Sequence, residues 1–363
     1  MKRRLAAAAL AGALLAAQPS AQPTSKFASI APLVEAAIDR HELPGAVVLV
    51  GHRDEIVFRQ AFGHRAIRPS PESMTDDTIF DLASLTKVVA TTTSVMQLVE
   101  EGHIRLSDTV AHYIPDFARY GKDGITIRQL LTHTSGLRPD LELQTEFDGA
   151  DEAIRRAVDE VPVAAPDERF VYSDINFFLL GRIVQLVSGE RLDQYARGRI
   201  FGPLSMGDTM FLPPEPLRGR IAPTERCRAR AWPCAGPDAA DVPFLRGIVH
   251  DPTARRMGGV AGHAGLFSTA ADLARFCRML LGGGALDGQR ILSPAAIARM
   301  TSPSTPAAMR DVRGLGWDLD STYSANRGDL FPVGSYGHTG FTGTSLWIDP
   351  QSRSYVVFLS NRV

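Results

Sequence analysis

The sequence has 363 residues, of which 44% are hydrophobic and 22% are charged, as is ordinary for a globular protein. A chain of this length can bury a large core without disulfide or metal staples, and it is long enough for two domains. Its formal net charge of −1 gives no electrostatic reason to expect nucleic acid or an anionic membrane as a partner.

The first residues differ from the rest of the chain. Lys2, Arg3 and Arg4 precede an apolar run over residues 5–17, and small residues follow. This order is typical of a secretory signal peptide, which we place at residues 1–21 with cleavage anywhere between 17 and 25. The run is too short to span a bilayer of about 30 Å as a helix. We therefore expect a periplasmic or secreted protein whose mature chain has no membrane span.

Hydrophobic periodicity predicts the secondary structure of the mature chain. Apolar positions repeat every three or four residues in the predicted helices, and short β-prone runs bounded by polar turns are the predicted strands. In chain order we expect a helix at 27–40, strands at 46–50 and 56–61, helices at 82–100 and 174–188, an irregular stretch at 202–258, helices at 269–282 and 294–301, and strands at 344–348 and 355–360.

Strands therefore lie at both ends of the chain, with helices between them. The economical arrangement is an α/β (α+β) fold with one antiparallel sheet built from both termini and flanked by helices. We assign residues 26–80 and 290–363 to the sheet domain and residues 81–289 to an inserted, mostly helical domain. The irregular stretch at 202–258 has a length that is usually associated with function.

Lysine is scarce in this sequence. Only Lys2, Lys26, Lys87 and Lys122 occur among 39 basic residues. Lys122 lies in a Gly-Lys-Asp-Gly turn, whereas Lys87 lies inside a predicted buried helix, three residues after Ser84. A partly buried lysine can release its proton and an arginine cannot, so a position that requires lysine suggests proton transfer. The N-terminal end of that helix would favour an alkoxide or oxyanion at Ser84. The alternative is a solvent-facing lysine beside a capping serine.

Two further segments carry residues suited to the same chemistry. Tyr172-Ser173-Asp174 begins a predicted helix, where a phenol near an ammonium can act as general base or relay. His338-Thr339-Gly340 precedes the last predicted hairpin, and a small residue such as Gly340 lets a substrate approach an edge strand.

The segments Ser84-Leu85-Thr86-Lys87, Tyr172-Ser173-Asp174 and His338-Thr339-Gly340, in this order, resemble the three motifs of the penicillin-recognising serine enzymes. That superfamily includes class C β-lactamases, penicillin-binding D-alanyl-D-alanine carboxypeptidases and related esterases. The segments at 130–137 and 259–268 are also similar, so the resemblance covers nearly the whole mature chain. It implies the same order of strands, helices and strands, and serine acyl chemistry.

The resemblance also implies roles for individual residues. Ser84 would be the acylated nucleophile, and Lys87 and Tyr172 would share proton transfer to and from it. The N–H of Ser84 and a second N–H near residues 342–344 would form the oxyanion hole. The residues assigned to substrate binding are Asp174, His338, Thr339 and Gly340.

Three features depart from the family pattern. Asp174 stands where the family usually has asparagine, and a carboxylate near Lys87 would favour the charged lysine and weaken it as a base. His338 stands where true β-lactamases often have lysine, and a histidine is mostly neutral at pH 7. Both changes lower the expected rate of β-lactam hydrolysis and leave ester, amide and peptide hydrolysis open. Family members usually continue into a helix that packs on the sheet, whereas this sequence stops at Val363.

The remaining candidate residues are assigned structural roles. His250, Asp251 and His263 fit no standard zinc spacing, so we expect no metal, and we expect no other cofactor. His133 and Ser135 are expected to cap a helix end.

The cysteines suggest one optional disulfide. Cys227 and Cys234 could pair in an oxidising compartment, with Trp232 between them as a packing residue or a pocket wall. Cys277 is expected in the core.

The leading expectation is an exported serine hydrolase that acts through a Ser84 acyl-enzyme on an amide, peptide or ester. Its substrate would be a small molecule or a peptide derived from peptidoglycan. The alternatives are a carboxylesterase of the same fold and a non-catalytic protein that binds penicillin or cell-wall fragments.

Overall fold

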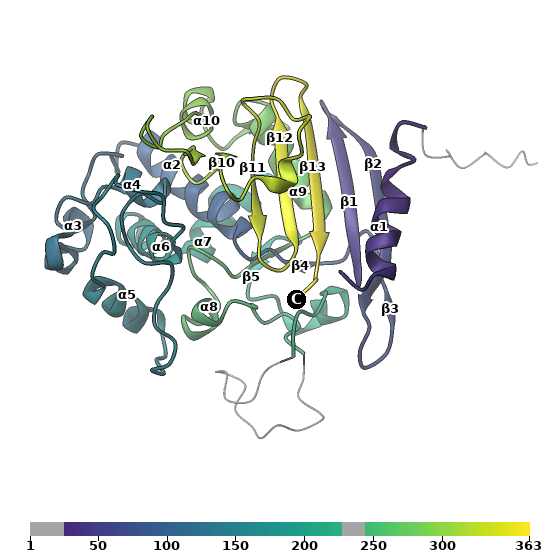
Figure 1. Ribbon diagram of the computed structural model, residues 1–363, viewed down its shortest axis with the longest axis horizontal. Coiled ribbons are helices and arrows are strands. Elements are labelled where there is room, and N and C mark those ends of the chain that lie inside the picture. The colour runs from purple at the N-terminus through teal and green to yellow at the C-terminus, as the bar shows by residue number, and fades with distance from the viewer. Residues whose placement is uncertain (1–24, 227–243) are drawn as a thin grey trace, which may run out of the picture.

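The computed structural model describes residues 25–226 and 244–363, and its centre is a large antiparallel sheet (Figure 1). From one edge to the other its eight strands are β3 (Glu72–Ser73), β2 (Glu55–Ala66), β1 (Gly45–His52), β13 (Ser354–Ser360), β12 (Thr344–Asp349), β11 (Tyr336–Gly340), β10 (Asp318–Asp320) and β9 (Val312–Arg313). Strand β1 pairs with β13 in a register that sets Ala46 opposite Ser360. Segments from both ends of the chain therefore meet in mid-sheet, which confirms the predicted fold class.

The central strand β1 is buried because each of its faces meets a different apolar layer. Val47 and Leu49 point into the main core, whereas Ala46 and Val48 belong to a smaller cluster with Val34 of helix α1 (Ile30–Asp39). Alternate side chains of a strand point to opposite faces, so an unbroken apolar run is expected where both faces are covered. Figure 1 shows α1 lying along β1 and β2.

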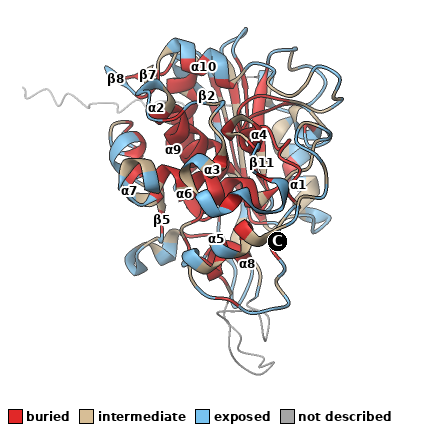
Figure 2. Cartoon of the chain, turned by 90° about the vertical axis from the view of Figure 1, so that its left-hand side faces the viewer, coloured by how far each residue is buried: buried red, intermediate tan, exposed pale blue. Residues whose placement is uncertain are grey.

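The other helices form the larger part of the molecule beside and behind the sheet (Figure 1). They are α2 (Thr93–Glu100), α3 (Val110–Tyr113), α4 (Ile127–Leu131), α5 (Ala150–Asp159), α6 (Asp174–Ser188), α7 (Leu192–Ala196), α8 (Pro252–Arg256), α9 (Ala270–Leu281) and α10 (Pro294–Met300). Helix α9 packs against β1 and β13, and α6 packs against α2, α4 and α5. Figure 2 shows buried residues gathered where α2 and α9 meet the sheet.

Helix α6 illustrates how the sequence fixes an element that carries site residues. Ile175, Phe178 and Ile183 are buried at helical spacing, and the helix ends at Gly189, whose φ of 75° lies in the left-handed region. The predicted helix at 174–188 is confirmed with the same bounds.

The predicted irregular stretch at 202–258 holds more structure than expected. Within this stretch, strand β5 (Met210–Phe211) pairs with β6 (Leu266–Ser268), which also pairs with β4 (Phe80–Asp81). The stretch ends with helix α8. A separate two-stranded ribbon joins β7 (Ala285–Leu286) to β8 (Gln289–Arg290). The division at residues 81–289 stays a prediction; α9 falls inside those bounds and packs on the large sheet.

Cys227, Trp232 and Cys234 lie outside the described residues, so their pairing and packing stay predictions. Cys277 is fully buried on α9, as expected. Among the residues that the structure describes, no helix combines the length and apolar character needed to cross a membrane.

Candidate active site

Ser84 lies on a tight turn between strand β4 and the first helical residue that follows it. Ala83 has a φ of 45°, in a region that side chains rarely adopt, and its N–H donates to Asp81 Oδ1 at 2.9 Å. The other carboxylate oxygen of Asp81 accepts from the N–H of His250 at 2.6 Å. Burial raises the pKa of Asp81 to about 6. The turn that presents Ser84 is thus held by a buried carboxylate.

The predicted helix at 82–100 is present but is not a uniform α-helix. Residues 87–92 form a π-helical turn, and α2 follows from Thr93. Single π turns are often found at functional sites. The turn is braced on one side by Thr91, whose hydroxyl donates to the carbonyl of Gly262 at 2.6 Å.

The fully buried ammonium of Lys87 touches three oxygen atoms. Its Nζ donates to Ser84 Oγ at 2.9 Å and to the carbonyl of His263 at 3.2 Å, and it pairs with Asp174 Oδ1 at 2.6 Å. The solvent-facing alternative for this lysine is therefore wrong. The structure brings the predicted pair Ser84 and Lys87 into direct contact.

The charge state of Lys87 follows from two opposing effects. Burial would lower the pKa of its ammonium, but Asp174 and Tyr172 outweigh burial and hold that pKa above its ordinary value. Lys87 is therefore a cation at neutral pH. Tyr172 lies beside this cation, where a phenol oxygen can relay a proton.

The ring of Tyr172 is held between two aromatic neighbours. His133 stacks on it with centroids 4.4 Å apart and Tyr323 lies 5.0 Å away on centroids, while Lys87 Nζ is 4.9 Å from the ring centroid. The N–H of Ser173 donates to His133 Nδ1 at 3.0 Å. This contact fixes the backbone directly after Tyr172.

The expectation of helix-end capping is confirmed for His133 and wrong for Ser135. Helix α4 ends at Leu131, and His133 follows in the left-handed region with a φ of 57°, where its N–H donates to the carbonyl of Leu130 at 3.2 Å and closes the helix end. Ser135 Oγ donates to Asn176 Oδ1 at 2.6 Å, across to helix α6. Both residues therefore tie the segment after α4 to the start of α6, where Tyr172 lies.

Strand β11 brings the third motif against the turn that carries Ser84. A β-carbon built on Gly340 would lie 2.4 Å from the carbonyl oxygen of Leu82 and 3.4 Å from the Ala83 side chain. Thr344 Oγ1 donates to that same Leu82 carbonyl at 3.0 Å, and Thr342 Oγ1 donates to the Asp81 carbonyl at 2.7 Å. Glycine is required here so that the strand can approach the turn.

His338 is a neutral residue in this setting. It is buried, and its Nδ1 lies 2.7 Å from the carbonyl of Thr339, which accepts the ring N–H. Burial, followed by the nearby cations Arg313 and Lys87, holds the pKa of His338 well below its usual range. The residue therefore offers no fixed positive charge to a substrate carboxylate.

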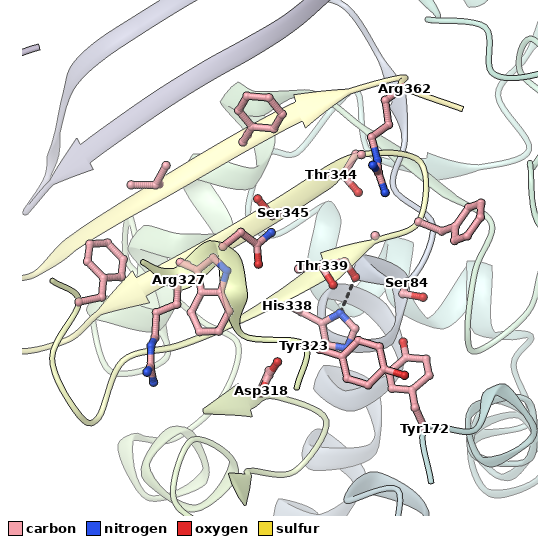
Figure 3. Close-up of a pocket in the computed structure, with 18 of the residues that line it drawn as sticks. Ser84, Tyr172, Asp318, Tyr323, Arg327, His338, Thr339, Thr344, Ser345 and Arg362 are labelled. Atoms are coloured by element: carbon pink, nitrogen blue, oxygen red, sulfur yellow. Dashed lines mark hydrogen bonds between the residues drawn. The ribbon is translucent and has the colours of Figure 1, made fainter. Parts of the chain in front are cut away.

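These elements enclose a cavity of about 800 Å³, large enough for a drug-sized ligand. Ser84, Tyr172, His338, Thr339 and Gly340 line it, and Figure 3 shows Tyr323 and His338 beside Tyr172. The cavity also reaches the sheet side chains Trp347, Val356 and Phe358. Asp174 is not among its lining residues; it lies behind, against Lys87.

The sequence did not predict several side chains of this site, because only packing between distant segments brings them there. Asp81 holds the serine turn, His133 stacks on Tyr172, and Tyr323 completes the aromatic wall. A signal existed only for Asp81, since an aspartate two residues before a turn commonly accepts a backbone N–H.

Comparison with known proteins places the chain in a family. Residues 30–363 match the family model described as Beta-lactamase. A protein of Escherichia coli (strain K12) that bears the name "Putative D-alanyl-D-alanine carboxypeptidase" is 34% identical over 349 residues, which cover 88% of this chain and 78% of that protein. A protein of the same name from Escherichia coli O157:H7 is 32% identical over the same shares of the two chains.

Solved structures share the fold. EstCE1, described as a hydrolase with promiscuous acyltransferase activity, has a TM-score of 0.73 at 23% identity and covers 92% of each chain. A penicillin-binding protein homolog from Caulobacter crescentus has a TM-score of 0.72 at 23% identity, with 94% of this chain and 93% of that chain covered. The chain therefore belongs to the Beta-lactamase family and is a serine hydrolase.

Proposed function

We propose that this hydrolase acts through an acyl-enzyme on Ser84 and that its substrates are small amides, peptides or esters, with D-alanyl peptides of the cell wall foremost. The observation that carries the proposal is the 2.9 Å contact between Lys87 Nζ and Ser84 Oγ beneath the ring of Tyr172. The names of the E. coli relatives support the choice of peptide substrate.

Each residue has a defined part in the proposed reaction. Ser84 Oγ attacks the carbonyl carbon while its proton passes to the oxygen of Tyr172, the proposed general base, which lies beside the ammonium of Lys87. The carbon–nitrogen or carbon–oxygen bond then breaks, and the leaving group takes the proton from Tyr172. Water next attacks the ester and gives its proton to the same base, which releases the acid and frees Ser84.

The oxyanion that forms in both steps needs preorganised donors. The N–H of Ser84 is one proposed donor, and the second belongs to residues 342–344, which are tied to the serine turn through the Asp81 and Leu82 carbonyls. The close approach at Gly340 supports this arrangement, because it keeps the two segments at a fixed separation.

A carboxylesterase of the same fold is the second candidate. It is favoured by the neutral His338, which cannot serve as a cationic anchor for a free carboxylate. A family VIII carboxylesterase has the same fold, with a TM-score of 0.71 and 24% identity.

A substrate panel separates the candidates. Rates on a peptide ending in D-alanyl-D-alanine, on p-nitrophenyl butyrate and on nitrocefin would be compared for the wild type and Ser84→Ala. The proposal predicts Ser84-dependent release of D-alanine and slow nitrocefin hydrolysis. Turnover of the ester alone would favour the carboxylesterase, and acylation without turnover would favour a binding protein.

We also propose that the protein works outside the cytoplasm, in the periplasm or as a secreted enzyme. The basic, apolar and small residues of 1–21 support export, and so does the name of the relatives, D-alanyl-D-alanine carboxypeptidase. N-terminal sequencing of protein recovered from the periplasmic fraction should find a chain that starts between residues 17 and 26. A chain that retains Met1 would contradict export.

A further inference from the structure

A second buried ion pair lies behind Lys87, on the side away from the cavity. His263 is 1% exposed, and its Nε2 lies 2.9 Å from Asp251 Oδ1. Asp251 caps the N-terminal end of helix α8 and accepts the N–H of Ala254 at 2.7 Å. His263 belongs to the glycine-rich segment before β6, where its own carbonyl accepts from Lys87 Nζ.

The two pairs form one cluster of alternating charge. The side chains of Asp174, Asp251 and His263 each present a polar atom within 4.8 Å of the other two, and Lys87 Nζ is 2.6 Å from Asp174. The charged groups that face the cluster from neighbouring elements are Asp81, Asp140 and Arg255. Burial raises the pKa of Asp140 to about 6, and Thr253 Oγ1 donates to its carboxylate at 3.0 Å.

We infer that Asp251 and His263 are a positioning pair for Lys87: Asp251 orients the buried imidazole of His263 and so fixes the His263 carbonyl that Lys87 contacts. This inference rests on the proposed function, in which Lys87 serves Ser84. It assigns a task to two residues that do not touch the substrate cavity.

The physical reason for this positioning role is charge balance in a buried site. With His263 charged, two cations face the carboxylates of Asp174 and Asp251. Burial would lower the pKa of His263, but Asp251 and then Asp174 raise it. If the imidazolium is lost while both carboxylates stay, the cluster keeps an extra negative charge, and a base beside it binds its proton more tightly. The base that serves Ser84 then works only at higher pH.

The test is the pH profile of labelling by a serine-directed fluorophosphonate probe, measured as a second-order rate constant. His263→Gln should move the midpoint of the rising limb upward by about one pH unit. Adding Asp251→Asn should move it back, because the double variant no longer holds an uncompensated carboxylate. Asparagine also keeps an oxygen for the N–H of Ala254.

Asp272→Asn is the matched control, because Asp272 is a buried carboxylate that bonds to Thr209 and the N–H of Asp208, outside this cluster. Its midpoint should equal that of the wild type. An unmoved midpoint in folded H263Q overturns the inference, and so does a double variant displaced further than H263Q. If H263Q does not fold, the double variant alone decides, since its midpoint must match the wild type. Absent labelling of the wild type at Ser84 would instead refute the proposed function.

Discussion

Lys87 and Lys122 are both fully buried, and their surroundings differ in chemistry. Lys87 contacts a hydroxyl, a carboxylate and one carbonyl. Lys122 Nζ donates to the carbonyls of Val158 and Glu160 at 2.8 Å and 2.5 Å, at the end of helix α5. The same residue type thus contacts the hydroxyl of Ser84 in one region and the carbonyls at a helix end in the other.

The pKa directions of the two lysines follow this difference. Burial lowers the pKa of Lys122, and Asp159 and Glu160 oppose it only in part. At Lys87 the neighbouring Asp174 and Tyr172 overcome burial and raise the pKa. Both lysines are buried in a chain whose basic residues are mostly arginine, so neither burial nor the choice of lysine over arginine identifies a functional lysine. The atoms that its Nζ contacts identify it.

Replacing each lysine with arginine should give the largest difference between the two sites. Lys87→Arg should lower the rate of acylation on the order of 10³-fold, because the larger guanidinium cannot occupy the contact with Ser84 Oγ. Lys122→Arg should keep the rate and lower the free energy of unfolding by about 2 kcal/mol, since two carbonyl contacts are disturbed. Labelling kinetics and thermal unfolding check both. Equal rates in the two variants would contradict the assignment.

The tyrosines beside the two lysines provide the next test. Tyr172→Phe should reduce kcat/KM roughly 100-fold, because the proposed general base is removed while the ring that stacks on His133 remains. Tyr120→Phe, at the exposed ring near Lys122, should leave kcat/KM unchanged. Steady-state kinetics on one ester substrate measure both effects. A Tyr172→Phe enzyme with wild-type kcat/KM would remove this residue from the mechanism.

Removing the carboxylate beside each lysine should change the pH dependence of kcat/KM at Lys87 and not at Lys122. Asp174 raises the pKa of Lys87, so Asp174→Asn should lower that pKa and move the falling limb of kcat/KM, where the Lys87 cation is lost, to lower pH, by up to about one unit. Asp159→Asn, beside Lys122, should leave the limb in place.

The stability effect of Asp174 has a fixed sign. Because the pKa of Lys87 is raised in the folded state, the pair stabilises the fold below the unfolded lysine pKa of about 10.4, and this contribution is lost as pH rises through the folded value. Asp174→Asn should therefore lower the melting temperature by the same amount at every pH from 5 to about 9. A loss confined to the acidic part of this range would contradict the account.

The smallest expected effect is that of metal removal. Asp174, Asp251 and His263 lie close together, but the ammonium of Lys87 already supplies the cation beside Asp174. Dialysis against EDTA should leave both acylation and the melting temperature unchanged. Loss of activity that Zn²⁺ restores would show that the expectation of no metal is wrong.

The sequence predicted the parts of the site whose residues lie close together in short segments of the chain. Ser84 and Lys87 are one helical turn apart, so their contact follows from spacing, and Tyr172 and Gly340 belong to tripeptides at element ends. The terminal hairpins were predictable for the same reason, because each is local in sequence.

The remaining features depend on contacts between distant segments. His133 meets the residue after Tyr172 across 40 positions, and His263 meets Lys87 across 176. No local pattern encodes such pairs. The π-helical turn at Lys87 was also beyond prediction, since periodicity does not distinguish it from an ordinary helix turn.

The most direct test of the central claim is mass spectrometry of the intact protein and its peptides after reaction with a fluorescent penicillin and a serine-directed phosphonate. We expect one adduct per chain, carried by the peptide that holds Ser84 and absent from Ser84→Ala. An adduct on another residue, or unchanged hydrolysis by Ser84→Ala, would contradict that claim.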